Sequence, residues 1–433
     1  MKLAVVVQRY GAHVDGGAEL HARYVAEHLG RHAEVEVVTT CATDYVTWRN
    51  ELPRGPDVVH GLTVRRFPVD RERDVGRFAR RSSMVFDRTH SQQDELAWLD
   101  SEGPASRALV RFLRTNRTAY DFFVFFSYRY YHAYHGIRAV GPRALLVPTA
   151  ERDEVIGLSI FDPVFRGVRA VMYNSPEERA MIAAASHNED VPGVVVGVGS
   201  EVHERPDPAR FRQRHGIAGR FAIYVGRIDE NKGCLELFDF FQRYARSRSS
   251  DFTLVLVGRA ILEIPAHPRI RHLGFVSDED KFDAIAAADV LIMPSYYESL
   301  SMVALEAWAL GRPVLVNGHC EVLKGQCIRS NAGLYYETYE EFAEAFRSIT
   351  GNTMLAEALG ANGSRFYRQH YTWPVIEGKY LDVLARLRAE DEAGSPAREV
   401  APLPGWLARR RRTLAPARER LAALPTGPVL DGR

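Results

Sequence analysis

Short apolar runs alternate with longer amphipathic stretches along most of the chain. The apolar runs are rich in β-branched residues, and several are apolar on both faces. This is typical of strands in a parallel sheet that helices cover on both sides. In the first part of the chain the predicted strands are Leu3–Val7, Val35–Thr39, Thr63–Phe67, Phe122–Phe126, Leu145–Val147, Ala170–Asn174 and Val194–Val198. After residue 220 they are Phe221–Val225, Thr253–Val257, Arg271–Leu273, Val290–Met293, Pro313–Val316 and Gly333–Tyr336.

The amphipathic stretches between these strands predict helices. Ala18–Leu29 carries apolar residues at helical spacing, and Gly30 follows as a stop signal. Ser175–Ala185 opens with serine, proline and two glutamates, which are favoured in the first turn of a helix. Further predicted helices are Leu235–Arg246, Asp278–Ala288, Ser301–Leu310 and Tyr339–Ile349.

The order of these elements predicts two βαβ arrays, and hence an α/β protein with two Rossmann-like, doubly wound domains facing one another across a cleft. The first domain is expected over residues 1–200 and the second over 201–370, with the polar segment 200–219 as the linker. Residues 371–390 are expected to form a helix that crosses back to the first domain. Residues 391–433 are rich in Pro, Ala and Arg, which predicts a flexible tail.

Composition excludes several classes of protein. Among 433 residues, 56 are Lys or Arg and 55 are Asp or Glu, so the formal charge is +1. This balance argues against a dedicated binder of duplex DNA. The four cysteines are scattered without a CxxC pair, which favours reduced thiols in a cytoplasmic protein. No apolar run approaches the roughly 18 residues that a membrane span needs, and the N-terminal run is interpreted as a strand, not a signal peptide.

A glycine-rich turn follows the first predicted strand and opens the first predicted helix, with the sequence Gly16-Gly17-Ala18-Glu19. Two glycines at a helix N-terminus let backbone N–H groups approach an anion such as a diphosphate. A tight turn that only requires a positive φ is an equally good interpretation of the glycines alone. The GxGxxG dinucleotide fingerprint is absent from the sequence.

Two cations follow the first strand of the second domain. In the segment from Gly226 to Gly233, Arg227 and Lys232 leave the end of the strand. Fixed cations at this place can neutralise a pyrophosphate and stabilise it as a leaving group. The alternative is that both are solvated loop charges.

Two glutamates with seven residues between them form the most specific pattern. Glu298 lies in the loop after a predicted strand, and Glu306 lies within the following helix among apolar neighbours. A carboxylate at that depth needs a partner, and a ribose with two adjacent hydroxyls would be a suitable one. The backbone of Ser299–Ser301 would offer N–H groups to phosphate or sugar oxygens. The alternative is an exposed Glu298 and a Glu306 paired with an arginine.

Taken together, these three elements resemble the retaining GT-B glycosyltransferases of family 4, which use sugar nucleotides. The resemblance covers roughly residues 1–385 and rests most firmly on Glu298-x7-Glu306. It implies an N-terminal acceptor domain and a C-terminal donor domain. The resemblance implies that Arg227 and Lys232 bind the donor diphosphate, that Glu306 binds the ribose and that Glu298 contacts the transferred sugar. It implies that Ser299, Leu300 and Ser301 bind sugar and phosphate oxygens, and that Gly16 and Gly17 border the phosphates and the acceptor. Gly226, Gly258 and Val276 would contact the nucleotide.

One element of the family is missing from this sequence. Many members carry a histidine in the N-terminal domain that contacts the donor sugar, but the corresponding segment, residues 147–154, has none. Glu151 or Asp153 is expected to take this place, with His132 and His135 as nearby alternatives. The preferred interpretation of the aromatic stretch around those histidines is core and cleft wall.

The resemblance implies transfer of a hexose-type sugar from a nucleoside diphosphate sugar to an acceptor hydroxyl, in polysaccharide, glycoconjugate or natural-product glycosylation. The acceptor would be a sugar, a lipid-linked molecule or a small molecule, and no nucleic acid, metal or further cofactor is expected. The acidic triplet Asp278-Glu279-Asp280 is explained by the first turn of a helix. Alternatives are a sugar-nucleotide epimerase, a phosphorylase or a non-catalytic sugar-binding relative.

The run Arg409–Arg412, with Trp406 and Leu407 before it, is basic and apolar. It can bind anionic lipid head groups, which would place the protein at the inner face of the membrane. A solvated tail is an equally good interpretation.

Overall fold

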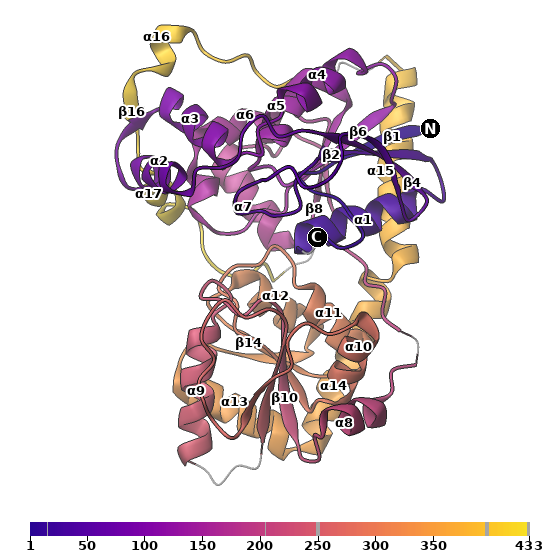
Figure 1. Cartoon of the computed structure of the whole chain (residues 1–433), viewed down its shortest axis with the longest axis vertical. Coiled ribbons are helices and arrows are strands. Elements are labelled where there is room, and N and C mark those ends of the chain that lie inside the picture. The colour runs from indigo at the N-terminus through magenta and orange to yellow at the C-terminus, as the bar shows by residue number, and fades with distance from the viewer. Residues whose placement is uncertain (15, 204, 248–251, 395–397, 431–433) are drawn as a thin grey trace. The chain divides into compact units, whose positions relative to one another are not determined.

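A computed structural model describes residues 1–14, 16–203, 205–247, 252–394 and 398–430. The chain forms two compact units (Figure 1). Unit 1 comprises Met1–Val198 and Glu377–Pro425, and unit 2 comprises Gly199–Ile376 and the last residues from Thr426. The first crossing lies near the predicted boundary at residue 200, and the second lies six residues after the predicted boundary at 370.

Unit 1 is built on an eight-stranded sheet. In spatial order its strands are β3 (Gly55–Val59), β4 (Leu62–Phe67), β2 (Glu34–Thr40), β1 (Lys2–Val6), β6 (Phe122–Phe126), β7 (Ala144–Val147), β8 (Ala170–Tyr173) and β9 (Gly193–Val195). All neighbours are parallel except β3, which forms an antiparallel hairpin with β4. Strand order reverses between β1 and β6, which are both fully buried over most of their length.

Helices and short 3-10 turns connect these strands. They are α1 (Gly17–Leu29), α2 (Val75–Asp87), α3 (Gln92–Glu102), α4 (Arg107–Thr115), α5 (Tyr131–Val140), η1 (Gly141–Arg143), η2 (Glu154–Gly157), η3 (Ser159–Phe161), α6 (Asp162–Gly167) and α7 (Pro176–Ser186). Side chains of Ser91, Ser106 and Ser175 cap the N-termini of α3, α4 and α7 by accepting backbone N–H groups. Such caps satisfy donors that have no partner inside the helix.

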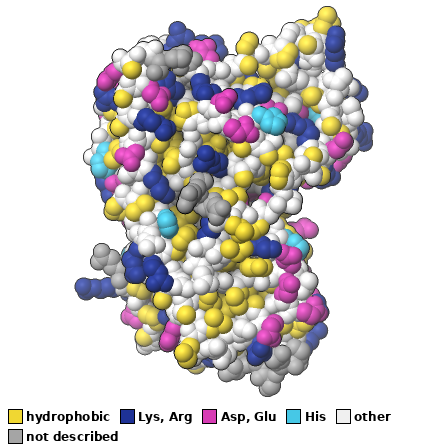
Figure 2. All heavy atoms as spheres, turned by 180° about the vertical axis from the view of Figure 1, so that it is seen from behind, with side chains coloured by type: hydrophobic (Ala, Val, Ile, Leu, Met, Phe, Trp, Pro, Cys, Tyr) yellow, Lys and Arg dark blue, Asp and Glu magenta, His cyan; other side chains and the backbone are white. Residues whose placement is uncertain are grey.

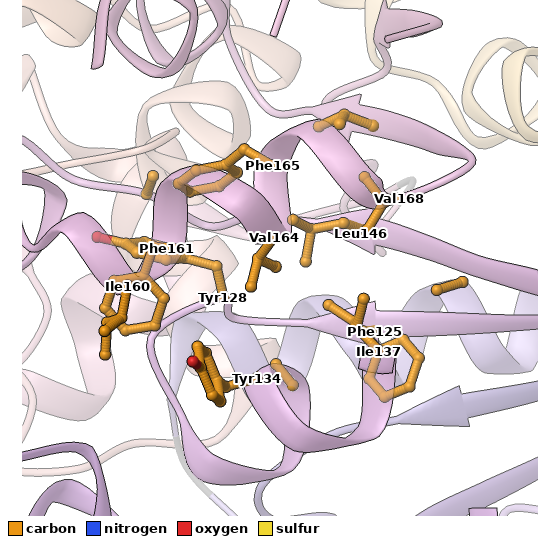
Figure 3. Packing of buried hydrophobic residues seen from close by; sticks show 14 of the residues in the cluster. Phe125, Tyr128, Tyr134, Ile137, Leu146, Ile160, Phe161, Val164, Phe165 and Val168 are labelled. Atoms are coloured by element: carbon orange, nitrogen blue, oxygen red, sulfur yellow. The ribbon is translucent and has the colours of Figure 1, made fainter. Parts of the chain in front are cut away.

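The core of unit 1 is strongly aromatic. Figure 3 shows Tyr128, Tyr134 and Phe161 packed together, and the rings of Tyr128 and Phe161 meet edge-on with centroids 4.9 Å apart. Phe125 and Ile137 extend the same cluster from β6 to α5. The aromatic segment after β6 is therefore largely a core element.

Unit 2 is built on a six-stranded parallel sheet. Its order is β12 (Ile270–His272), β11 (Thr253–Val257), β10 (Phe221–Val225), β13 (Val290–Met293), β14 (Val314–Asn317) and β15 (Gly333–Tyr336). Its helices are α8 (Pro208–His215), α9 (Cys234–Ser247), α10 (Asp278–Ala287), α11 (Met302–Ala309), α12 (Glu321–Ser330), α13 (Tyr339–Gly351) and α14 (Thr353–His370). Helices α9 and α13 cover one face and α10, α11 and α14 the other (Figure 1). The predicted α/β class with two Rossmann-like sheets is confirmed.

Two features of unit 1 have no counterpart in the prediction. One is β3, which forms a hairpin with the predicted strand β4 and exposes Val58. The other is the group of helices α2, α3 and α4 between residues 75 and 115. The many arginines in α2 and α4 obscure the apolar face that buries these helices.

The expectation of a flexible tail over 391–433 is wrong for the described residues 398–425. After α15 (Trp373–Glu392) the chain forms α16 (Trp406–Arg409), β16 (Arg412–Leu414) and α17 (Ala417–Ala422). Strand β16 pairs antiparallel with β5 (His90–Ser91), and Ala417 is completely buried. The physical reason is that sparse apolar residues of the tail fit a surface that unit 1 has already formed. Residues 395–397 and 431–433 of the predicted tail lie outside the described residues.

Candidate functional site

The strand order of unit 2 reverses between β10 and β13, and this point organises the site. In open parallel sheets, ligands bind beyond the carboxyl ends of the strands where the order reverses. The chain leaves β10 through the loop 226–233 into α9, and it leaves β13 through the loop 294–301 into α11. Arg227 and Lys232 lie in the first loop, and Glu298 lies in the second.

Lys232 and Glu298 meet across these two loops. The Lys232 Nζ atom donates to Glu298 Oε1 at 2.7 Å. Their side chains are 27% and 11% exposed, so the pair is partly shielded from water but still reachable by a ligand. A cation and a carboxylate predicted from separate motifs therefore share one place at the edge of the sheet.

Asp229 organises the loop that carries the two cations. One of its carboxylate oxygens accepts the backbone N–H of Lys232 at 2.8 Å, and the other forms an ion pair with the Arg227 guanidinium. The Tyr224 hydroxyl donates to the Arg227 carbonyl at 2.7 Å. The Arg227 side chain is 38% exposed, which leaves it accessible at the loop surface.

Glu306 is buried in α11 and belongs to a second cluster. Its Oε1 atom accepts hydrogen bonds from Lys281 Nζ at 3.0 Å and from Ser200 Oγ at 2.8 Å. Its Oε2 atom is buried and has no hydrogen-bond partner among the described residues. The partner of this carboxylate is thus a lysine, not the arginine considered as the alternative.

Lys281 and Ser200 are site residues that the sequence motifs do not predict. Burial lowers the pKa of Lys281, but the charges of Glu306 and Asp278 outweigh it and raise the pKa above its usual value. Lys281 is therefore a cation at physiological pH. Nothing in the spacing of these residues indicates that the Lys281 side chain of α10 reaches Glu306. The neighbouring Phe282 is buried, and this apolar neighbour is the sequence feature that could have placed Lys281 near the core.

The loop before α11 ends in a cap. The Ser301 side chain accepts the backbone N–H of Ala304, so its hydroxyl caps the helix. Leu300 is buried, and Ser299 lies in the sequence between Leu300 and Glu298, which pairs with Lys232.

The loops that follow β10 and β11 meet in a close backbone contact at Gly226 and Gly258. A Cβ atom on Gly258 would lie 2.0 Å from the carbonyl oxygen of Gly226, and the φ of Gly258 is +131°. Any side chain at Gly258 would therefore push apart the loops that follow β10 and β11. Val276 is half-buried, and its neighbour Phe275 is 76% exposed.

The glycine turn in unit 1 is built over a buried ion pair. Gly16 has a φ of +146° and precedes α1 as its N-cap. Glu19 accepts hydrogen bonds from Arg9 Nη2 at 2.6 Å and from Gln8 Nε2 at 2.9 Å. A Cβ atom on Gly16 would lie 2.1 Å from Glu19 Oε2. The glycine is therefore required for packing against Glu19, whereas Gly17 has open space around its Cα.

The histidines and acids considered for the N-terminal contact have different environments. His132 is buried and donates from Nε2 to the Phe126 carbonyl at 3.1 Å, and burial lowers its pKa to about 4. Burial together with Arg138 lowers the pKa of His135 to about 4. Asp153 caps η2 and pairs with Arg129 Nη1 at 2.6 Å. Of these residues, Glu151 is half-buried and is not committed to a helix cap.

The acidic triplet and the cysteines have structural roles in the part of the chain that the structure describes. Asp280 of the acidic triplet pairs with Arg214 at 3.2 Å and His215 at 2.8 Å, and Ser277 caps the same helix. Within the described ranges, no three His, Cys, Asp or Glu side chains gather in a way that could hold a metal ion. All four cysteines are buried free thiols. Among the described residues, none of the helices combines the length and apolar character that crossing a bilayer requires.

Comparison with known proteins agrees with this geometry. A model of the family described as Glycosyl transferases group 1 matches residues 219–352, which contain both loops of the site. The chain is 30% identical over 231 residues to D-inositol 3-phosphate glycosyltransferase of Jonesia denitrificans, covering 47% of this chain and 53% of that protein. It is 27% identical over 196 residues to mannosylfructose-phosphate synthase of Agrobacterium fabrum, covering 40% and 41%. The chain thus spans about half the length of these relatives, or less.

Solved structures show the same fold over nearly the whole chain. Sucrose-phosphate synthase from Thermosynechococcus elongatus superposes with a TM-score of 0.65 at 16% identity, over 90% of this chain and 99% of that one. Anabaena HepE in complex with UDP and glucose superposes with a TM-score of 0.64 at 16% identity, over 89% and 99%. At such identities the likeness establishes the fold, which is GT-B. The chain is thus similar to the group 1 glycosyl transferases over residues 219–352 and has the GT-B fold over nearly its whole length.

Proposed function

We propose that the protein transfers a hexose-type sugar from a nucleoside diphosphate sugar to an acceptor hydroxyl, with retention at the anomeric carbon. The observation that carries the proposal is the Lys232–Glu298 ion pair at the point where the strand order of unit 2 reverses. The names of the relatives, a glycosyltransferase and a sugar-phosphate synthase, support it. So does the solved complex of a GT-B neighbour with UDP-glucose.

The demanding event in such a reaction is departure of the diphosphate, because negative charge accumulates on it. Lys232 and Arg227 offer positive charge beside the end of β10, and Asp229 fixes the loop that carries them. Charge that is in place before the reaction needs no reorganisation, and removing one such donor typically costs about 3–4 kcal/mol of barrier. In this proposal Lys232 exchanges part of its contact with Glu298 for the diphosphate.

Glu306 would hold the ribose of the donor. Its Oε1 is occupied by Lys281 and Ser200, and its buried Oε2 still lacks a donor. A buried acceptor without a partner is costly, and a ribose hydroxyl would satisfy it. Because Lys281 and Ser200 hold Oε1, Oε2 is the atom left to accept a ribose hydroxyl.

Glu298 would position the transferred sugar. We assign the reaction to attack from the face that the leaving group occupies. The bond from the anomeric carbon to the phosphate oxygen breaks, and the bond to the acceptor oxygen forms on the same side. The acceptor proton passes to the departing phosphate. The two cations neutralise the diphosphate in this scheme, and no divalent metal is invoked. The acceptor belongs to polysaccharide, glycoconjugate or natural-product glycosylation.

A panel of sugar nucleotides tests this function. Thermal unfolding is measured with UDP-, GDP-, ADP- and dTDP-sugars, since a ligand that binds the folded state raises the melting temperature. The stabilising donor is then incubated with acceptor pools, and NMR gives the anomeric configuration of the product. A retained configuration and acceptor-dependent release of nucleoside diphosphate are expected. Conversion of the donor without any acceptor would indicate an epimerase instead, and an inverted product would refute retention.

A further inference from the structure

Helix α16 of unit 1 exposes two large apolar side chains. In α16, Trp406 is 56% exposed and Leu407 is 73% exposed. The guanidinium of Arg410 lies over the Trp406 ring, 4.2 Å from its centroid. In Figure 2 the upper-right lobe, where Figure 1 places the α16 segment, carries hydrophobic and basic side chains next to each other. Large exposed apolar side chains among cations are unusual on a surface that meets only water.

Helices α4 and α5 of unit 1 lie close to the α16 segment. The Arg409 charge acts on the phenol of Tyr134 in α5, and the Arg138 guanidinium lies 4.2 Å from the centroid of the Tyr134 ring. His135, also in α5, is influenced by both Arg138 and Arg114 of α4. Helix α4 packs directly on α5. Segments that are almost 300 residues apart in the sequence therefore lie close to one another in unit 1.

These segments are basic although the chain as a whole is nearly neutral. Residues 104–120, 131–143 and 400–416 hold four, two and four arginines and not one Asp or Glu. Arg107 is neutralised by Asp70 at 2.8 Å, and Arg143 donates a hydrogen bond to the Tyr120 carbonyl. Within the described part of the chain, the eight other arginines of these three segments form no ion pair. They are Arg111, Arg114, Arg117, Arg138, Arg409, Arg410, Arg411 and Arg412.

Some of these guanidinium groups lack acceptors. The Nε and Nη1 atoms of Arg138 and the Nε atom of Arg409 are buried without a hydrogen-bond partner among the described residues. Burial also lowers the pKa of Arg138. Phosphate oxygens are the acceptors that planar guanidinium groups bind best. These two guanidinium groups therefore have hydrogen-bonding capacity that the described residues do not use.

We propose that these eight arginines with Trp406 and Leu407, here called the arginine–tryptophan surface, dock the protein on the surface of a bilayer that contains anionic lipids. The arginines contact lipid phosphates, and Trp406 and Leu407 enter the boundary between head groups and acyl chains. Exposed Trp406 and Leu407 favour a lipid surface over a nucleic acid, which offers phosphates without an apolar layer beneath them. The proposal is independent of the reaction that the protein catalyses.

Sedimentation with vesicles tests the proposal on the full chain. The vesicles contain either phosphatidylcholine alone or phosphatidylcholine mixed with the anionic lipid phosphatidylglycerol, whose negative surface potential attracts basic segments. The test variants are Arg410→Gln/Arg411→Gln/Arg412→Gln and, separately, Trp406→Ser/Leu407→Ser. A matched control removes three exposed arginines of unit 2, Arg243→Gln/Arg347→Gln/Arg365→Gln. Melting temperatures verify that each variant is folded.

The wild type and the control are expected to bind the anionic vesicles and to leave the neutral ones unbound. Each arginine removed from the surface lowers vesicle affinity about fivefold, so the triple variant loses about a hundredfold. The Trp406→Ser/Leu407→Ser variant retains salt-sensitive binding but loses affinity. Equal binding by the arginine variant and the control would overturn the proposal. The proposal would also be overturned if the wild-type protein did not bind anionic vesicles but bound a short duplex DNA.

Discussion

Lys281 Nζ lies 3.0 Å from Glu306 Oε1, and both side chains are largely shielded from water. The lysine comes from α10 and the glutamate from α11, whereas the third member of the cluster, Ser200, is the second residue of unit 2. The Ser200 carbonyl also accepts the Tyr367 hydroxyl at 3.1 Å. The start of unit 2 is therefore bonded to the carboxylate that we assign to the ribose.

Lys281→Met is expected to weaken binding of the nucleoside diphosphate by about tenfold to a hundredfold, because hydrogen bonds to charged groups contribute about 1.5–3 kcal/mol. Without the lysine, Glu306 can rotate or take up a proton, and Oε2 is no longer held for the ligand. Titration calorimetry with the stabilising diphosphate measures the effect. Lys281→Arg keeps the charge and should recover part of the affinity.

Lys324→Met is the matched control, since Lys324 forms a comparable but exposed pair with Glu337 at 2.6 Å in the same unit. It is expected to bind as the wild type does. Unchanged binding by folded Lys281→Met would show that Lys281 does not position Glu306 for a ligand.

The arrangement of strands was predictable because strands of a buried parallel sheet are apolar on both faces, as β10 and β13 are. Glu306 stood out because a carboxylate among apolar neighbours needs a partner. Glu298 stood out because it lies in the loop after a predicted strand, with seven residues between it and Glu306. Lys281 did not stand out, because a lysine after three acidic residues in a first turn looks like a solvated charge. Only packing of α10 beside α11 brings it to Glu306.

The docking of the tail could not be predicted for a related reason. Ala417 is buried because it meets Gly157, whose Cβ, if present, would lie 2.1 Å from the Ala417 carbonyl oxygen. A contact over 260 residues leaves no periodic pattern in a short segment. Pro, Ala and Arg are also common in solvated tails, so composition pointed in the wrong direction.

Ala417→Glu tests this docking. A carboxylate at a fully buried position has no space and no partner, so α17 is expected to detach from η2. Trypsin should then cut at Arg409–Arg412 much faster than in the wild type. Ala422→Glu places the same charge on the exposed end of the same helix and should leave the cleavage rate unchanged. Equal cleavage of the two variants would contradict the docked tail.

Glu19→Ala is expected to destabilise unit 1. It removes the carboxylate that balances the buried Arg9 charge, and breaking a buried pair from one side costs about 3–5 kcal/mol. Glu34→Ala is the control, because Glu34 is 68% exposed and pairs with Lys2 on the surface. Chemical denaturation compares the two variants. A loss of less than about 1 kcal/mol in Glu19→Ala, the usual value for a surface pair, would refute the structural role of Glu19.

Stability should depend on pH through His90. Burial lowers the pKa of His90, but hydrogen bonds to Glu95 and to the Arg88 carbonyl outweigh it and raise the pKa above its usual value. A raised folded-state pKa means that the imidazolium stabilises the folded protein fully below the unfolded pKa of about 6.5. This stabilisation is lost as the pH rises through the folded value.

The difference in melting temperature between the wild type and His90→Gln is therefore expected to be largest near pH 6 and to shrink towards pH 9. Other titrating groups act equally on both proteins and cancel in the difference. A difference that stays constant, or grows with pH, would mean that His90 is neutral in the folded protein.

Turnover by Lys232→Ala at saturating donor tests the central claim most directly, namely that cations at the end of β10 stabilise the departing diphosphate. The account predicts a fall in kcat of about a hundredfold to a thousandfold, corresponding to about 3–4 kcal/mol, in a variant that still folds. Lys324→Ala, measured in the same assay, should turn over at the wild-type rate. Near-normal turnover by Lys232→Ala would contradict the account.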